Sequence, residues 1–165
     1  MGVSKIDGTL EEAVLKRVRR NLRVYERLTF RLHDGTSKSI AKAIVDKPVA
    51  ERLLPGTSGR FYLYTAIDHR GVHGVRDTAG QATFAYPTAN EKALLIMMPL
   101  LALWFAVSVV FLDRVPLLPA IIFIIGVPFY FLYRSTRLEA RRQFDADVEY
   151  RPAGGVPLGG ATAGA

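Results

Sequence analysis

The sequence predicts an α+β membrane protein in which a small N-terminal β-barrel precedes a transmembrane hairpin of two helices. Charge distribution is the main reason. Residues 1–91 hold fifteen Lys or Arg and ten Asp or Glu, whereas residues 93–112 and 115–133 hold no charged side chain. The second reason is a strand-like pattern in the polar part. The chain therefore divides into a polar N-terminal unit and an apolar unit that suits a bilayer.

The first strand signals follow a short lead-in. Thr9 and Glu12 have the spacing of a helical capping box, so residues 1–13 are expected to form a helical or irregular lead-in. From there the even positions carry the apolar side chains Val14, Val18, Leu22, Val24, Leu28, Phe30 and Leu32. A period of two predicts strand with one buried face, and a bend would divide this segment into two strands.

The rest of the barrel is predicted from turn signals and β-rich segments. The turn HDGT at 33–36 leads into SKSIAKAIVD, a third strand with core candidates Ile40, Ile44 and Val45. VAERLL predicts a short helix, and RFYLYTAID, VHGVRD and QATFAY predict two further strands, the last of them interrupted. This order over residues 14–91 resembles the OB-like barrel architecture.

The two apolar runs at 93–112 and 115–133 contain 20 and 19 residues, and each is long enough to cross a bilayer as a helix. A single helix over both runs would place Asp113 and Arg114 at its centre, where each charge costs about 2.5 to 3.5 kcal/mol. A turn at this point avoids the cost, so residues 92–133 are expected to form a transmembrane hairpin. The alternative, two helices in a soluble core, would need more polar shell than the chain supplies.

The flanking charges predict the orientation. Lys92 precedes the first run and an arginine-rich segment follows the second, whereas the tip between the runs carries Arg114 beside Asp113. Basic flanks stay in the cytoplasm, so both termini should be cytoplasmic. Residues 134–151 are expected to extend the second helix as a basic cytoplasmic segment. Residues 152–165 are Gly, Ala and Pro with little core-forming content and should be disordered.

Three segments, TFRLHDG at 29–35, LLPGTSGRFYLY at 53–64 and GVHGVR at 71–76, carry a resemblance to uncharacterised bacterial membrane proteins in which an OB-like barrel precedes two membrane helices. The resemblance covers roughly residues 12–133. It implies a multi-pass protein of the bacterial inner membrane. It supplies a layout and no known chemistry, so no catalytic or ligand-binding residue follows from it.

The motifs predict neither an enzyme nor a bound cofactor. The chain has no cysteine, which excludes a disulfide framework and a thiolate nucleophile. GTSG at 56–59 lacks the ending of a phosphate-binding loop and is expected to be a turn. His69 and His73 have no evident third ligand, so they predict two polar residues on an exposed hairpin and no metal site. No pair of acidic and basic side chains suited to proton transfer stands out in the sequence, and no nucleophile motif does either.

The basic residues are the remaining site candidates, as contacts for anionic lipid or another polyanion. They fall into an N-terminal and a C-terminal group: Arg17, Arg19, Arg23, Arg27 and Arg31, and then Arg134, Arg137, Arg141 and Arg142. Nucleic acid, stacked on Phe61, Tyr62 and Tyr64, is the less favoured partner because a tethered domain has an anionic bilayer nearer to it. The preferred function is a membrane-anchored interaction module or accessory subunit that binds a protein partner or a second copy. The alternative is a tethered sensor that binds a ligand or nucleic acid.

Overall fold

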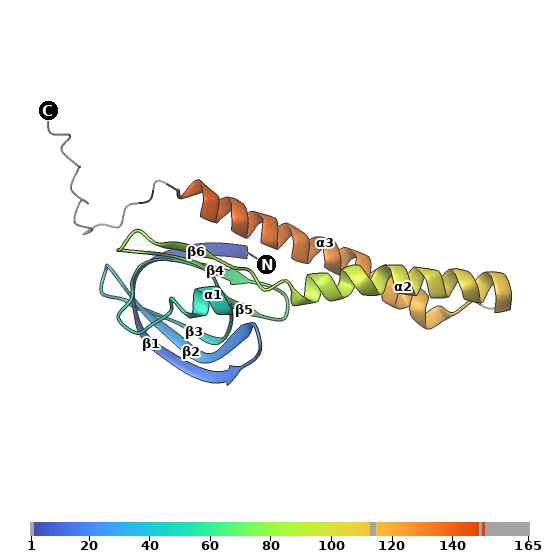
Figure 1. The fold of residues 1–165 in the computed structure, drawn as a ribbon, viewed down its shortest axis with the longest axis horizontal. Helices are drawn as coiled ribbons and strands as arrows, with labels where there is room; N and C mark the ends of the chain where they lie inside the picture. The colour runs from blue at the N-terminus through green and yellow to red at the C-terminus, as the bar shows by residue number, and fades with distance from the viewer. Residues whose placement is uncertain (1, 113–114, 149, 151–165) are drawn as a thin grey trace, which may run out of the picture.

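The computed structural model describes residues 2–112, 115–148 and 150, which form a β-barrel joined to a pair of long helices. Figure 1 shows the barrel at one end of an elongated molecule and the two helices projecting from it side by side. The second helix is the longer of the two and returns along the surface of the barrel. The two units of the fold are therefore connected by packing as well as by the chain.

Five strands close into the barrel, with a short helix between the third and the fourth, and a short sixth strand pairs with the fifth outside the closed ring. The elements are β1 (Gly2–Val18), β2 (Leu22–Leu32), β3 (Ser37–Asp46), α1 (Lys47–Ala50), β4 (Ser58–Thr65), β5 (Arg70–Asp77) and β6 (Ala82–Phe84). Neighbouring strands pair in the order β3-β2-β1-β4-β5-β6, and a parallel contact between Ala43 and Arg70 joins β3 to β5. The predicted small barrel and the position of its helix are confirmed.

The N-terminal lead-in expected over residues 1–13 is wrong, because β1 begins at Gly2. Its first half pairs with β4, from Gly2 opposite Thr65 to Thr9 opposite Ser58. Its second half pairs with β2. The partner residues on β4 lie about fifty to sixty positions away in sequence, and no local pattern reports a contact of that kind. Long-range pairing has overridden the local capping signal.

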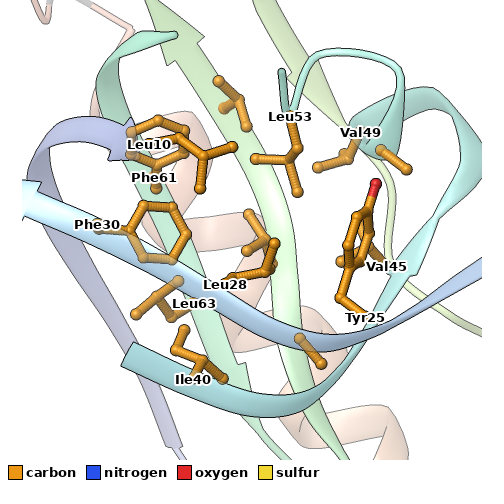
Figure 2. Packing of buried hydrophobic residues seen from close by; sticks show 14 of the residues in the cluster. Leu10, Tyr25, Leu28, Phe30, Ile40, Val45, Val49, Leu53, Phe61 and Leu63 are labelled. Atoms are coloured by element: carbon orange, nitrogen blue, oxygen red, sulfur yellow. The ribbon is translucent and has the colours of Figure 1, made fainter. Parts of the chain in front are cut away.

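The barrel interior is filled by aliphatic and aromatic side chains, shown in Figure 2. Phe30 and Phe61 meet at its centre with ring centroids 4.8 Å apart. Val49 of α1 and the following Leu53 are also buried in this cluster. The barrel therefore has a packed core rather than an internal ligand cavity, as is usual for small barrels.

The strict period of two predicted for the first segment holds only in part. Val14 and Val18 are exposed, by 37% and 56%, although they occupy predicted core positions. In β2 the buried residues are Tyr25, Leu28 and Phe30, so the step from the first to the second is three positions instead of the two that strict alternation requires. Register shifts in β1 and the positive φ of 53° at Lys42 in β3 accompany this bend. Bulges rotate the side-chain alternation, which a periodicity count cannot anticipate.

Closure of the barrel depends on a glycine at the seam between β3 and β5. A Cβ atom at Gly71 would collide with the backbone carbonyl of Ile44 on the neighbouring strand. The same carbonyl accepts a 2.9 Å hydrogen bond from the Tyr64 hydroxyl on β4. The absence of a side chain at Gly71 lets the two strand backbones approach closely enough to close the ring.

The two helices are α2 (Ala89–Leu112) and α3 (Leu117–Ala146), and both are long and apolar enough to cross a membrane. The first begins four residues before the predicted run. The N-cap residue of α3 is Pro116. The charged tip Asp113–Arg114 and the tail 152–165 lie outside the described residues.

The outer surfaces of the helices are apolar and uncovered. In the most apolar stretch of each helix, only 6% of α2 and 11% of α3 is buried by the rest of the chain. Trp104 and Phe111 are 62% and 78% exposed. Helices in the core of a soluble protein would be covered by their own chain, so the soluble-core alternative does not describe this fold.

Candidate functional site

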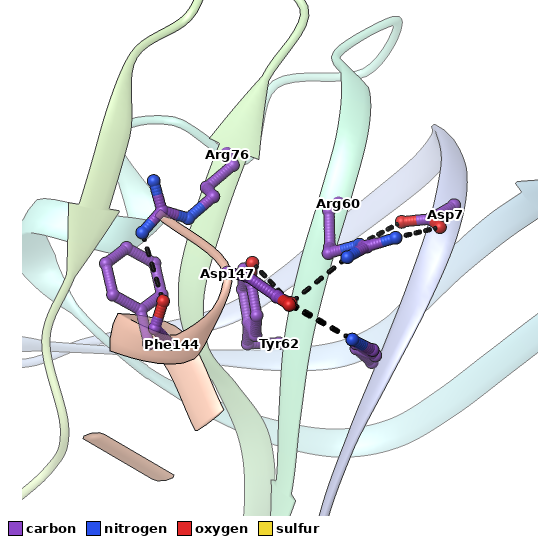
Figure 3. A network of polar contacts seen from close by, with 7 residues as sticks. Asp7, Arg60, Tyr62, Arg76, Phe144 and Asp147 are labelled. Carbon is purple, nitrogen blue, oxygen red and sulfur yellow. Dashed lines mark hydrogen bonds and ion pairs between the residues drawn. The ribbon is translucent and has the colours of Figure 1, made fainter. Parts of the chain in front are cut away.

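The most elaborate polar arrangement on the molecule joins the C-terminal end of α3 to the barrel, and Figure 3 shows it. Asp147, immediately after α3, accepts hydrogen bonds of 3.1 Å each from Lys5 on β1 and from Arg60 and Tyr62 on β4. Arg60 also binds both carboxylate oxygens of Asp7 on β1, at 2.6 and 2.7 Å. Three segments that are far apart in sequence are thus joined through two carboxylates and one guanidinium group.

These contacts fix the charge states of the groups that form them. The hydrogen bond from Arg60 lowers the pKa of Asp7 below its ordinary value. Burial by itself would raise the pKa of Asp147, but the hydrogen bonds from Lys5, Tyr62 and Arg60 outweigh burial and lower it. Burial, together with the hydrogen bond to Asp147, raises the pKa of Tyr62. At neutral pH the network holds two ionised carboxylates and a neutral phenol, and it serves as a clamp rather than a proton-transfer site.

Aromatic rings reinforce the clamp. The guanidinium group of Arg76 on β5 donates a 3.0 Å hydrogen bond to the Phe144 carbonyl and lies 4.3 Å from the centre of the Phe144 ring. The same ring packs edge-on against Tyr62, with centroids 5.0 Å apart. A Cβ atom at Gly74 would overlap with it, so this strand position has room for the ring only because it is glycine. Cation–π and edge-to-face contacts of this kind each stabilise by about 1 kcal/mol.

Beneath α3 lies His73, which is fully buried, so its predicted place on an exposed hairpin is wrong. Its ring is surrounded by Tyr62, Tyr64, Phe84 and Tyr86, with centroid distances between 5.7 and 6.2 Å. Neither ring nitrogen has a hydrogen bond of good geometry to a described residue. Burial lowers the pKa of His73 to about 4, against an opposing effect of the Ala140 backbone. His73 is therefore neutral at physiological pH.

A second junction joins the end of the barrel from which the helices project to both of them. Asp68, in the turn between β4 and β5, accepts hydrogen bonds of 2.9 Å from Asn90 of α2 and from Tyr133 of α3. Its other close partner is His69, at 2.6 Å. One turn further along, Arg137 of α3 forms a 3.0 Å ion pair with Glu91 of α2. The barrel is therefore attached to the helices at two separated points.

The predicted N-terminal arginines do not share one face. Arg27 and Arg31 alternate with the buried Leu28 and Phe30, so they lie on the outer side of β2. Arg23 and buried Tyr25 both precede the bend and are two residues apart, so Arg23 lies on the side of the strand opposite to Arg27 and Arg31. Arg17 is near the end of β1, and Arg19 lies in the turn between β1 and β2. The structure brings together only those near this turn.

The four C-terminal arginines are spread along α3. Arg134 donates a 3.0 Å hydrogen bond to the Tyr130 hydroxyl, and Arg137 is paired with Glu91. Arg141 pairs with Asp145 at 3.3 Å, and Arg142 is exposed. They form a row of single contacts rather than one concentrated site.

The residues that sequence reasoning missed are those of the clamp, above all Asp7, Arg60, Tyr62 and Asp147. Each is an ordinary strand or helix-end residue in the sequence, and no motif marks it. A cluster of three or more His, Asp or Glu side chains able to hold a metal ion is not found in the described part of the chain. The clamp holds the end of α3 on the barrel and fixes the orientation of the barrel relative to the helices. Among the residues of the clamp, no nucleophile is paired with a base.

Comparison of the chain with protein-family models, with curated proteins and with solved structures finds no significant match. No family is assigned on this basis. The functional argument therefore depends on the geometry of the barrel, the helices and the clamp.

Proposed function

We propose that this protein is a membrane-anchored, non-enzymatic interaction module, in which the helical hairpin crosses a bacterial inner membrane and presents the barrel to a partner. The partner would be a protein subunit of a larger complex or a second copy of the chain. The observation that carries the proposal is the continuity of α3, which spans 30 residues from the apolar hairpin to the clamp. A barrel attached in this way has a fixed orientation relative to the bilayer.

The attachment of the barrel to the helices favours a role in presenting a binding surface over a role in catalysis. A flexible linker would let the barrel rotate freely, whereas two separated attachment points hold it by hydrogen bonds, ion pairs and ring contacts. The interior of the barrel is packed, so a partner would bind to its outer surface. A fixed orientation reduces the entropy lost when two membrane-bound proteins associate, because part of their rotational freedom is already removed.

The proposed orientation places both termini and the barrel in the cytoplasm. Lys92 and the arginines after the second run flank the hairpin on the barrel side, whereas the tip contributes Arg114 alone. Positive flanks of short loops are retained in the cytoplasm. A reporter enzyme fused after Ala165 should be active only in the cytoplasm, and activity restricted to the periplasm would overturn this orientation.

Photo-crosslinking in native membranes tests the module itself. A photoreactive residue at the exposed position Lys38 on β3 should give a protein adduct of defined mass, identified by mass spectrometry. The same residue at Val110, on the exposed apolar surface of α2, serves as the control for random collisions. The adduct should weaken in Asp147→Asn, which loosens the clamp, and persist in Asp145→Asn. Adducts of equal yield at both sites, or none at several barrel positions, would contradict the proposal.

A further inference from the structure

The turn between β1 and β2 carries the densest group of basic side chains on the barrel. Residues 16–23 read KRVRRNLR, with five basic residues and no acidic one. Within the described part of the chain, none of these five forms an ion pair, in contrast to Arg60, Arg137 and Arg141. The charge of the turn is therefore available to a partner.

Two apolar side chains accompany these charges. Leu15 and Val18 are 49% and 56% exposed, although they lie on a strand of the barrel. We call residues 15–23 the basic tip. Apolar side chains set among lysines and arginines are typical of segments that lie at a membrane interface, where the apolar groups enter the acyl boundary and the cations bind headgroups.

The position of the basic tip favours contact with the same bilayer. Figure 1 shows the turn between β1 and β2 at the end of the barrel from which α2 and α3 project. The turn between β4 and β5, which carries Asp68 and contacts both helices, lies at that end too. Because the clamp prevents the barrel from swinging away, the basic tip is held toward the membrane plane marked by Lys92 and Arg134.

The surroundings favour lipid over nucleic acid. The aromatic residues suggested as base-stacking platforms, Phe61, Tyr62 and Tyr64, are at most 1% exposed. Phe61 packs in the barrel core, Tyr64 belongs to the cluster beneath α3, and Tyr62 packs against Phe144 of α3, so none of the three is available for stacking. Sequence-independent binding of single strands usually needs such platforms beside a basic groove. The basic tip has charge and aliphatic side chains, which suit an anionic headgroup layer.

We propose that the basic tip docks on the anionic cytoplasmic leaflet, as a third membrane contact besides the two helices. Leu15 and Val18 enter the interface, and the guanidinium groups of the turn bind lipid phosphates. This inference rests on the proposed anchoring of the hairpin, and it adds a dependence on lipid charge that anchoring alone does not require. Each basic residue near an anionic leaflet contributes to the attraction, and salt screens it.

The test uses the full chain in nanodiscs of phosphatidylcholine, with or without an equal part of phosphatidylglycerol. The chain lacks cysteine, so Leu15→Cys provides a unique site for an environment-sensitive fluorophore. Ser37→Cys, exposed at the far end of the β2–β3 ribbon, is the matched barrel control. Val110→Cys reports hairpin insertion. Quenching by nitroxide-labelled lipid measures contact at each position.

We expect quenching at Leu15→Cys only with phosphatidylglycerol, decreasing as salt rises, and no quenching at Ser37→Cys. Replacing Arg17, Arg19 and Arg20 by Gln should lower the ratio of docked to undocked tip on the order of a hundredfold. The charge-matched variant with Gln at Arg27, Lys38 and Arg52 should change it little.

The outcomes separate this proposal from the anchoring on which it rests. Quenching at Val110→Cys without quenching at Leu15→Cys would overturn tip docking and leave the anchor intact. Absence of quenching at Val110→Cys would overturn the anchor itself. A stronger fluorophore response at Leu15→Cys to a single-stranded oligonucleotide than to anionic lipid would assign the tip to nucleic acid and overturn the lipid proposal.

Discussion

Acidification should destabilise the docking of α3 on the barrel through a single side chain, His73. Its imidazole is buried among aromatic rings, and burial lowers its pKa from the ordinary 6.5 to about 4. The unfolded chain therefore binds a proton on this residue at a higher pH than the folded protein does. Stability is at its full value above pH 6.5 and decreases as the pH falls toward 4, because protonation favours the state in which the ring is solvated.

The size of this effect follows from the two pKa values. One pH unit corresponds to 1.36 kcal/mol, so the complete change is roughly 3 kcal/mol, of which about 2 kcal/mol is lost by pH 5. For a domain of this size that corresponds to a fall of roughly 10 °C in the thermal midpoint. The pKa values of Asp7 and Asp147 lie below their ordinary 3.8, so these carboxylates titrate below the range of pH 7.5 to pH 5 in which stability is measured.

The assay compares wild type with His73→Phe and His73→Leu in a nonionic detergent. Thermal unfolding of the barrel is followed by circular dichroism between pH 7.5 and pH 5. Both variants should lose most of the pH dependence, whatever their absolute stability, and the two other histidines are present in every protein compared. Equal decreases of the midpoint in all three proteins would refute the assignment to His73.

Three further predictions concern the barrel and the clamp. Gly71→Ala should destabilise the barrel by about 2 to 4 kcal/mol in denaturant titrations, because its Cβ would collide with the Ile44 carbonyl; a change under 0.5 kcal/mol would contradict this closure. Asp147→Asn should cost about 1 to 3 kcal/mol and increase amide exchange at the end of α3, whereas the exposed control Asp145→Asn should cost under 0.5 kcal/mol. Phe61→Ala should cost about 3 to 5 kcal/mol by leaving a cavity at the barrel centre, and near-wild-type stability would place the ring outside the core.

Much of the layout follows from patterns that are local in sequence. Two charge-free runs of helical length report two apolar helices, because crossing hydrocarbon requires a continuous stretch of apolar residues. Turn signals such as HDGT and the β-rich segments around Phe61 report the strands, since turn geometry and side-chain alternation depend on near neighbours. A short helix between the third and fourth strands is also found, although α1 covers Lys47–Ala50 and the prediction covered residues 49–54.

The candidate site could not be obtained in this way. Asp147 contacts Lys5 and Arg60 across more than eighty residues of sequence. In the sequence His73 has the surroundings of a polar hairpin residue, and only the packing of α3 over it shows that its side chain is buried. These features arise when distant segments pack together, and none is encoded in the spacing of its neighbours.

A polar β-rich unit, two apolar helices and a strongly basic stretch at residues 16–23 can be read from composition and periodicity, because these are properties of single segments. The start of β1 at Gly2, the clamping of α3 to the barrel and the position of the basic tip on the side of the hairpin become visible only in the folded chain. Strand pairing, burial and charge compensation depend on which surfaces meet in space.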